Sequence, residues 1–537
     1  MSTIYGIYTG YHSQSISLVK DGQIVNCLEE ERMARIKAGD RHDGLPELSL
    51  KKMEEITGLK FEDADYRMDV YPHHSPFAKE ISNGKPYEVL SHQTAHCAGA
   101  YFTSGMEGKV LTLSYDGGGH KHFMKVFLCE DGKMTEVYNQ EISNTGSLPH
   151  VWAFVTSGIM GYDEYMEGKW KMCKDEGKLM GMAPEGQYDD KIYNILSSVI
   201  KYDNLKFYPS GTAEKTRFVI DSMLYSGFFE TQKQRENVSF NLQKITEDLM
   251  IQFFNDLHDR FPEYTKISVA GGLFANVKLN QKINELPWLD EMYVYPPMGD
   301  EGLSLGAALW KANQIGELPK PLKLKNVSFG PSYDDDVIEQ ISKEYDFIKH
   351  PLNLSEIAND INDGKIIGWF DGGMELGPRA LGNRSILVRP TQIQTHRALN
   401  VRLSRYDTMP FAPMILEDYF DDVFTCSKSK YSSQFMTICY STKNEWIDKI
   451  PAVVQKSDKT ARPQIISSEN NPKIHELMSH YKELSGIPLI LNTSFNTHGE
   501  PIIENPHHAF RHLKNKVVDK LVMGNYVYKN RQCKNLL

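Results

Sequence analysis

The stretch KVLTLSYDGGGHKHFMKVFLCEDGKMTEVYNQE, residues 109–141, predicts a strand, a glycine-rich turn at 116–119 and a hairpin that turns at Asp131-Gly132. Asp-Gly between two alternating apolar runs is a strong short-range signal for a β-hairpin. Residues 3–30, TIYGIYTGYHSQSISLVKDGQIVNCLEE, repeat the same order of strand, polar loop and Asp-Gly hairpin. The two copies indicate a duplicated structural unit.

The length of the chain predicts more than one domain, because 537 residues exceed what a single hydrophobic core usually organises. A proline- and lysine-rich passage, residues 316–335, interrupts the periodic patterns and is the predicted boundary. Helix and strand patterns alternate after it, which is typical of an α/β domain. We therefore expect an α/β protein with a duplicated sugar-kinase/actin-like domain at 1–325 and a second α/β domain at 336–537.

The composition is that of an ordinary globular protein, and the net charge of −10 gives no electrostatic signature of sequence-independent duplex binding. Seven scattered cysteines without a CxxC pair indicate reduced thiols rather than disulfides or a cysteine-zinc site. The N-terminus lacks the features of a signal peptide, and no apolar run approaches the roughly 18 residues of a membrane span. We expect a cytoplasmic protein that does not enter the membrane.

Two histidines in EVLSHQTAHCAGAYF, His92 and His96, are four residues apart and would share one face of a helix. Such a pair on its own is more often two hydrogen-bonded core histidines than a metal site. Asp116 and Asp300 change this interpretation, because each lies in a glycine-flanked loop where its carboxylate can point into a cleft. Two imidazoles and two carboxylates suit a borderline divalent ion such as Fe(II), Mn(II) or Zn(II).

Two glycine-rich turns are candidate phosphate-binding loops. In SYDGGGH, Gly117 and Gly118 allow a ligand to approach the backbone N–H groups closely, and VAGGLFANVKLN (269–280) joins a strand to a helix through Gly271 and Gly272. Either stretch can equally be a simple structural turn. Neither stretch matches the Walker or Rossmann phosphate-loop pattern.

The second domain carries arginines among glycines. DGGMELGPRALGNRSILVRP (371–390) contains Arg379 and Arg384, and KTARPQ (459–464) contains Arg462. Arginine binds phosphate or carboxylate through two N–H groups at once, although most arginines are only solvated surface residues. LNTSFNTHGEP (491–501) adds polar side chains after an apolar strand: Asn492, Ser494 and Asn496. Together these loops favour a small phosphorylated ligand.

These strings resemble the carbamoyltransferase family that includes the nodulation-factor, cephem and tobramycin O-carbamoyltransferases. The resemblance extends from about Tyr5 to about Tyr528. The motifs that carry it are MELGPRALGNRSIL, GDEGLSLGAAL, VAGGLFANVKLN, EEERMARIK, EGKLMGMAPEG, KTARPQ and LNTSFNTHGEPI. The resemblance implies a sugar-kinase/actin-like domain followed by a YrdC-like domain. In such enzymes the YrdC-like domain joins carbamoyl phosphate and ATP, supplied with Mg(II), into carbamoyl adenylate. The other domain then transfers the carbamoyl group to a substrate hydroxyl.

The resemblance also implies roles for particular residues. His12, in GYHSQS, matches the N-terminal loop histidine, a reasonable general base for the hydroxyl. The metal ligands implied are His92, His96, Asp116 and Asp300, with Fe(II) favoured. The nucleotide side of that site is implied to comprise Gly117, Gly118, Lys178, Gly271, Gly272 and Asn276. The adenylate-forming site is implied to comprise Arg379, Arg384, Arg462, Asn492, Ser494 and Asn496.

The chain departs from the family pattern near the acceptor and near the carbamoyl phosphate. Ser13 follows His12 where the family has an acid, and His120 stands where an acid is common. In NVRLSRYDTMPFAP the family's Lys-x-Arg pattern is absent, so Arg402 or Arg405 is a candidate for the role of the lysine.

The sequence leaves two classes of acceptor open, a small natural product and a hydroxymethylated nucleotide or DNA. It also leaves open whether the protein forms a homodimer. Basic clusters such as KSDKTARP favour nucleic acid, whereas the net charge of −10 speaks against it. An ATP-binding module of the same fold without carbamoyl transfer is the alternative.

Overall fold

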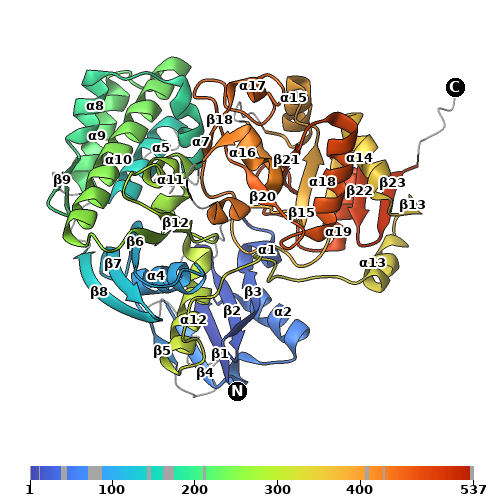
Figure 1. The fold of residues 1–537 in the computed structure, drawn as a ribbon, viewed down its shortest axis with the longest axis horizontal. Coiled ribbons are helices and arrows are strands. Elements are labelled where there is room, and N and C mark those ends of the chain that lie inside the picture. Colours follow the sequence, from blue (N-terminus) through green and yellow to red (C-terminus); the bar gives the residue numbers. More distant parts are fainter. Residues whose placement is uncertain are drawn as a thin grey trace. The chain divides into compact units, whose positions relative to one another are not determined.

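The computed structural model describes residues 2–10, 12–37, 45–70, 87–141, 147–160, 175–209, 213–405, 410–426, 428 and 430–531. Contacts group the chain into two compact units (Figure 1). The first unit comprises residues 1–89, 301–312 and 324–537, and the second comprises 90–300 and 313–323. The boundary between separately folding domains, expected at 316–335, stays a prediction.

Each unit contains a five-stranded sheet, and the two sheets have the same topology. In each sheet the first three strands form an antiparallel meander, in which the second strand pairs with the first and with the third. On its other side the first strand pairs parallel with the fourth strand, and the fourth strand pairs parallel with the fifth. The predicted duplicated α/β fold is confirmed. The strands, in this topological order, are β1 (Thr3–Tyr8), β2 (Ser15–Lys20), β3 (Gln23–Glu29), β4 (Tyr66–Asp69) and β5 (Glu88–Val89) in the first unit, and β6 (Val110–Gly119), β7 (His122–Glu130), β8 (Lys133–Glu141), β11 (Lys266–Ala270) and β12 (Glu291–Val294) in the second.

The two Asp-Gly hairpins form where the sequence predicts them. Asp21 and Gly22 have φ values of 52° and 71°, and Asp131 and Gly132 have φ values of 50° and 79°. Positive φ at both central residues is the type I′ geometry, whose twist matches that of the flanking strands.

The predicted turn at 116–119 is different in the structure. β6 continues through Gly119, the pairing register shifts between Tyr115 and Gly119, and the chain reverses at His120 and Lys121. An irregularity of this kind leaves residues outside the regular ladder. It releases Asp116 and the glycines after it from regular pairing, so that their side chains and N–H groups are available for other contacts.

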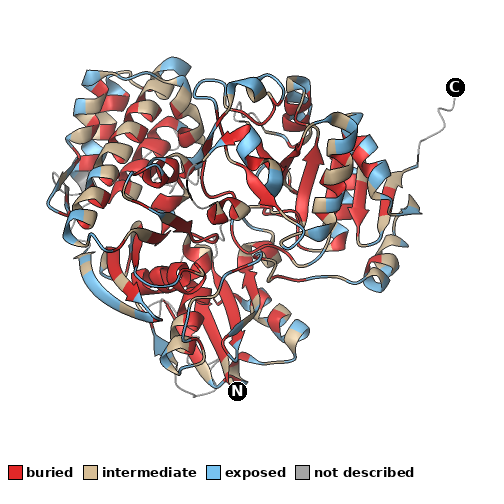
Figure 2. Cartoon of the chain, viewed as in Figure 1, coloured by how far each residue is buried: buried red, intermediate tan, exposed pale blue. Residues whose placement is uncertain are grey.

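The second unit also contains the helices between residues 92 and 284. The longest begins with a capping box in which Thr231 and Gln234 satisfy each other's backbone N–H groups. Figure 1 shows a group of helices from this part of the chain, and Figure 2 shows that α4 is buried along its whole length. The helices and remaining strands are α4 (His92–Phe102), α5 (Leu148–Met160), α7 (Glu176–Met182), α8 (Asp190–Ser197), α9 (Ala213–Tyr225), α10 (Gln232–Arg260), α11 (Val277–Asn284), β9 (Ile200–Asp203) and β10 (Lys206–Pro209).

The C-terminal part of the first unit contains a mixed eight-stranded sheet, in the order β13-β23-β22-β14-β15-β21-β16-β20, which confirms the α/β class expected there. Its core includes Trp369 and Tyr481, both 1% exposed. The elements are α13 (Asp335–Ser342), β13 (Phe347–Pro351), α14 (Leu354–Asn362), β14 (Ile367–Phe370), β15 (Arg384–Val388), α15 (Ile393–Arg402), β16 (Ala412–Leu416), β20 (Gln464–Ile466), α18 (Pro472–Ser485), β21 (Leu489–Ser494), α19 (Pro506–Lys514), β22 (Lys520–Met523) and β23 (Tyr526–Asn530).

The smaller elements complete the first unit. A three-stranded sheet, in the order β17-β18-β19, accompanies the eight-stranded sheet. Among the described residues, none of the helices has the length and apolar character needed to cross a bilayer. The elements are α1 (Glu30–Ala34), α2 (Glu47–Thr57), α12 (Leu303–Gln314), α16 (Phe420–Val423), β17 (Phe424–Thr425), β18 (Tyr440–Thr442), α17 (Asn444–Ile447) and β19 (Thr460–Ala461).

His508 is expected to make the stability of the first unit sensitive to acid. It lies in the first turn of α19, where its Nδ1 accepts the backbone N–H groups of Glu504 and Asn505, each at 3.4 Å. Burial, followed by the charges of Arg35 and Arg511, lowers the pKa of His508 to about 3. The unfolded chain takes up a proton here below about pH 6.5 and the folded chain does not, so stability falls as the pH falls from about 6.5 towards 3.

We expect the free energy of unfolding to decrease by about 1 kcal/mol between pH 6.5 and 5.5 from this group, after allowance for solvent screening. Urea unfolding at several pH values measures the slope. His508→Gln is the control variant, because glutamine at this helix position preserves the capping box and does not titrate. An unchanged slope in His508→Gln would show that the pH dependence comes from other groups.

Candidate metal and anion sites

His92 and His96 project from the buried helix α4 towards two carboxylates. The side chain of Ser91 accepts the N–H of Thr94 and so fixes the start of the helix immediately before His92. His92 Nε2 lies 3.2 Å from Asp116 Oδ2 and 3.3 Å from Asp300 Oδ1, and His96 Nε2 lies 3.3 Å and 3.5 Å from the same two atoms. One ligand atom from each of the four residues lies within 4.8 Å of all the others. The four residues that the sequence singled out therefore converge at one point.

Glycines hold Asp116 in this position. Its Oδ1 accepts the N–H groups of Gly117 at 2.7 Å and Gly272 at 3.1 Å, which leaves Oδ2 for the histidines. Gly271, with φ of 99°, donates its N–H to Met298 O in the segment just before Asp300. The two glycine turns thus place both carboxylates of the cluster.

The electrostatics of the cluster favour a cation at its centre. Burial disfavours a charge on His92, but Asp300 and Asp116 outweigh burial and raise the pKa of His92 to about 10. Burial and Asp300 act against ionisation of Asp116, yet its hydrogen bonds to His92 and His96 hold its pKa well below the usual range. Two buried carboxylates close together need a compensating positive charge. Protonated imidazoles would provide it, and a divalent ion would provide it when the imidazoles are neutral, so the donor set fits a borderline metal ion.

Gly119 provides the space for His92. A Cβ atom at residue 119 would lie 2.1 Å from His92 Cγ and 2.4 Å from its Nδ1. We expect Gly119→Ala to displace the imidazole, to lower the affinity for Mn(II) and to cost about 1–3 kcal/mol of stability. Calorimetric Mn(II) titration and thermal unfolding measure the two effects. Gly177→Ala is the control for stability, because a Cβ at that helical position meets nothing within 4 Å. Unaltered Mn(II) binding by Gly119→Ala would contradict this account of the cluster.

The residues predicted on the nucleotide side divide into two groups. Gly117, Gly271 and Gly272 lie at the cluster, as described above. Asn276 caps α11, and its amide is bonded to Leu279 N–H and to the side chain of Gln243, so its contacts are structural. Gly118 lies in the irregular part of β6 with φ of 148°. Lys178 Nζ forms an ion pair with Asp175 at 3.2 Å, and its contact with a nucleotide stays a prediction.

The predicted general base, His12, lies in the loop between β1 and β2. Its Nδ1 is 3.3 Å from Ser13 Oγ, and Ser13 has φ of 55°. The hydroxyl of Ser13 therefore lies beside the imidazole of His12.

A second cluster consists of arginines in the C-terminal part of the first unit. Burial, followed by the nearby charge of Arg462, lowers the pKa of Arg379 to about 9. Burial also lowers the pKa of Arg462, and the charge of Arg405 adds to the effect. The Nε atoms of Arg379 and Arg462 are buried and have no hydrogen-bond partner among the described residues. Buried like charges with unused donors are the arrangement of an anion-binding site.

Arg405 connects this cluster to the predicted polar loop. Its Nη2 donates to Ser494 Oγ at 3.4 Å and its Nη1 to Thr493 Oγ1 at 3.3 Å, at the end of β21. Ser494 thus contacts Arg405, and its role in an adenylate-forming site stays a prediction. Of the two arginines that were candidates for the role of the family lysine, Arg405 is the one in this cluster. Arg402 forms an ion pair with Asp519 at 2.7 Å instead.

Arg384, unlike Arg379, forms several hydrogen bonds to the backbone. It is fully buried, lies 3.7 Å from the centre of the Phe370 ring and donates to four backbone carbonyls at 2.9–3.1 Å. Glu375 supports the same loop, since its Oε1 accepts the N–H groups of Leu381, Asn383 and Arg384 at 2.7, 2.7 and 3.2 Å. These bonds give Arg384 a structural role in the loop, and its contact with a ligand stays a prediction.

Asn492 and Asn496 also use their amides within the fold. Asn492 Nδ2 donates to Ala380 O at 2.8 Å, directly beside Arg379, and Asn496 Nδ2 donates to Thr497 O and Glu500 O at 2.8 and 3.0 Å.

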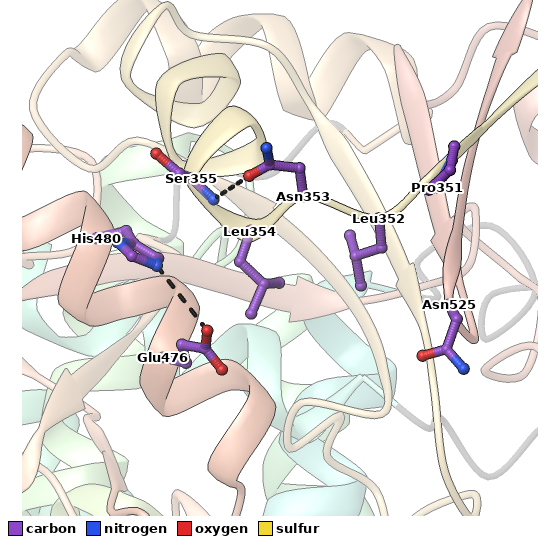
Figure 3. A pocket seen from close by; sticks show the side chains of 8 residues that line it. All are labelled: Pro351, Leu352, Asn353, Leu354, Ser355, Glu476, His480 and Asn525. Carbon is purple, nitrogen blue, oxygen red and sulfur yellow. Dashed lines mark hydrogen bonds and ion pairs between the residues drawn. The ribbon is translucent and has the colours of Figure 1, made fainter.

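An open pocket of about 460 Å³ elsewhere in the first unit is lined by Leu354, His480 and their neighbours and contains none of the predicted site residues (Figure 3).

Comparison with known proteins assigns the chain to a family. The model for the carbamoyltransferase N-terminus matches residues 50–309, and the model for the carbamoyltransferase C-terminus matches residues 358–530. Nodulation protein U of Bradyrhizobium diazoefficiens is 30% identical over 77% of this chain and 72% of its own length. The chain belongs to the carbamoyltransferase family.

Other relatives cover this carbamoyltransferase almost completely. An uncharacterised protein of Methanocaldococcus jannaschii is 30% identical over 98% of this chain and 99% of its own length. Nodulation protein NolNO of Sinorhizobium fredii is 28% identical over 97% of this chain and 80% of its own. The family resemblance drawn from the sequence motifs is thereby confirmed.

One residue of this carbamoyltransferase that lies beside the histidine–carboxylate cluster was not predicted from the sequence. His150, in α5, lies with its Nε2 3.7 Å from the place where a Cβ on Gly117 would be. Ser147 fixes the imidazole, because its N–H donates to His150 Nδ1 at 3.4 Å and its Oγ accepts the N–H of His150 at 3.5 Å. Burial lowers the pKa of His150. A neutral imidazole with Nδ1 as acceptor carries its proton on Nε2, towards Gly117. The pattern Ser-x-x-His at a helix start could have indicated it.

Proposed function

We propose that this carbamoyltransferase makes carbamoyl adenylate from carbamoyl phosphate and ATP and transfers the carbamoyl group to a hydroxyl of an acceptor. The observation that carries the proposal is the convergence of His92, His96, Asp116 and Asp300 at one buried point beside two glycine turns. A duplicated sheet with such turns is suited to hold an adenylate next to a bound cation.

The arginine cluster supports the adenylate-forming step. Arg379, Arg405 and Arg462 supply positive charge and N–H donors that a phosphate group would satisfy. A bond between a carbamoyl oxygen and the α-phosphorus of ATP forms as pyrophosphate leaves. That step requires a free carbamate oxygen, so the phosphate of carbamoyl phosphate must first leave as inorganic phosphate after attack by water. The balanced products are carbamoyl adenylate, pyrophosphate and phosphate.

The histidine–carboxylate cluster supports the transfer step. A divalent ion held by the four side chains would stabilise the negative charge that develops on the carbamoyl and phosphate oxygens, and Fe(II) is favoured over Mn(II) and Zn(II). His12 is the proposed base for the acceptor hydroxyl, with Ser13 Oγ orienting the imidazole. His150 Nε2–H faces the turn at Gly117 and is a suitable donor to an oxygen bound there.

The acceptor is a hydroxyl compound, either a small molecule or a hydroxymethylated nucleotide in DNA. His120, Lys121 and His122 follow the glycine turn at Asp116, and an anionic acceptor would complement them. Binding to labelled DNA that weakens steeply with salt would favour the nucleic acid, whereas no binding would favour a small alcohol.

Pyrophosphate release tests the proposal. We expect release only when ATP and carbamoyl phosphate are both present, and none with either compound alone. The alternative, an ATP-binding module without carbamoyl transfer, predicts nucleotide binding that carbamoyl phosphate does not affect. Absence of pyrophosphate with both substrates would refute the proposed reaction.

A further inference from the structure

Glu29, the last residue of β3, and Arg32 in α1 hold the glycine loop before Arg379. The N–H of Gly377 donates to Glu29 Oε1 at 2.7 Å, and Gly377 O accepts Arg32 Nη2 at 2.7 Å. One residue of the loop is therefore held at both its donor and its acceptor. Gly377 has φ of 98°, a conformation that favours glycine. Arg379 follows two residues later, so this contact sets the direction in which the chain enters the arginine cluster.

The side chains that hold Gly377 are charged and buried. Arg32 is 1% exposed and Glu29 is 4% exposed. Arg32 Nε lies 3.4 Å from Glu29 Oε2 and 3.1 Å from Glu31 Oε1. Burial disfavours the charge of Arg32, but Glu29, Glu31 and Glu375 outweigh burial and raise its pKa. Burial also raises the pKa of Glu29 to about 8, whereas the charge of Arg32 acts to lower it. A charged, paired arginine at a buried place is costly to assemble, so it points to a requirement for one fixed geometry.

The same short segment also contacts the loop that carries His12 and the loop after Ser494. The N–H of Glu30 donates to Gln14 O at 2.9 Å, two residues from His12. Arg35 donates to Ile502 O at 2.6 Å and to Pro501 O at 2.8 Å. Residues 29–35 thus touch the histidine loop, the arginine loop and the loop after β21.

We propose that Glu29 and Arg32 are positioning residues of the anion site, which hold the Gly377 peptide so that Arg379 is placed to bind a phosphate group. The inference rests on the proposed function, because the anion is taken to be the phosphate of the adenylate-forming substrates. Neither residue contacts the anion itself. Their loss should weaken phosphate binding without affecting the histidine–carboxylate cluster.

Binding of inorganic phosphate to the full chain, measured by calorimetry, tests the inference. The variant is the double substitution Glu29→Gln with Arg32→Met, which removes the closest buried charge pair together; Glu375 keeps its hydrogen bonds to the backbone N–H groups of Leu381, Asn383 and Arg384. The amide oxygen introduced by Glu29→Gln can still accept the N–H of Gly377, so the protein should fold. We expect phosphate affinity to fall by about 10- to 100-fold, the KM for carbamoyl phosphate to rise in parallel and Mn(II) affinity to stay unchanged. Arg32→Lys, which retains one donor for Gly377 O, should recover part of the affinity.

Arg67→Met is the matched control. Arg67 is another buried arginine of the first unit, and it donates to the carbonyls of Phe61, Glu62 and Ala64. This substitution should lower the melting temperature and leave phosphate affinity unchanged. A folded double variant with wild-type phosphate affinity would overturn the inference, as would a wild-type chain that binds no phosphate. A wild-type chain that binds phosphate but releases no pyrophosphate would overturn only the proposed reaction.

Discussion

Replacing His92 with alanine is expected to abolish carbamoyl transfer while leaving pyrophosphate release close to the wild-type rate. His92 touches both carboxylates of the cluster, and its loss leaves Asp116 and Asp300 buried with one imidazole fewer between them. Losing a group that stabilises charge in a transition state typically costs about 10²–10³ in rate. The arginine cluster is built from other residues, so adenylate formation should continue. Pyrophosphate release and carbamoyl transfer to the acceptor are measured on the same protein.

His258→Ala is the matched control for that experiment. His258 belongs to the second unit and stacks on Trp288 with ring centres 4.3 Å apart, and it takes no part in the cluster. The control should retain both activities. Equal loss of pyrophosphate release and transfer in His92→Ala would show that the two steps share one site, contrary to this account.

Arg379→Met and Arg384→Met should have opposite effects on stability, although the two arginines are five residues apart in one glycine loop. Arg379 is a half-buried charge repelled by Arg462, and its buried Nε has no hydrogen-bond partner among the described residues. Its replacement should raise the free energy of unfolding by about 1–3 kcal/mol and reduce pyrophosphate release by about 10²–10³. Arg384 satisfies four carbonyls, so its replacement should destabilise the protein by a few kcal/mol.

Urea unfolding and pyrophosphate release, measured on both variants, distinguish a ligand-binding arginine from a structural one. Arg384→Met serves as the comparison, because any loss of activity there should track the loss of folded protein. If Arg379→Met is as destabilised as Arg384→Met, the Arg379 guanidinium supports the fold and the anion site is assigned to the wrong residue.

Much of the fold could be predicted from local sequence, because its decisive signals are local. The two Asp-Gly hairpins require positive φ at adjacent residues, and few sequences other than Asp-Gly meet that requirement well. The shift of register after Tyr115 could not be predicted. It depends on how β6 pairs with β7 and on contacts with Gly272 and His92, which are distant in sequence.

The histidine–carboxylate cluster could be predicted as a set of residues but not as a geometry. The spacing of His92 and His96 shows that they share a helix face, whereas the distance from Asp116 to Asp300 depends on the parallel pairing of β6 with β11 and of β11 with β12, the strand that precedes Asp300. The different engagement of Arg379 and Arg384 could not be predicted either. Only the folded structure shows which guanidinium donates to backbone carbonyls and which has an Nε without a hydrogen-bond partner in the described part of the chain. The contacts of Glu29 and Arg32 with Gly377 could not be predicted either, because they join residues more than 340 positions apart in the chain.

The amount of divalent metal bound per chain tests the central claim most directly. We predict that calorimetric titration with Mn(II) under anaerobic conditions finds one tight site in the wild type, no tight site in Asp116→Asn, and an unchanged site in Arg379→Met. Tight binding of one ion per chain by Asp116→Asn, or no tight binding by the wild type, would contradict the assignment of the metal to His92, His96, Asp116 and Asp300.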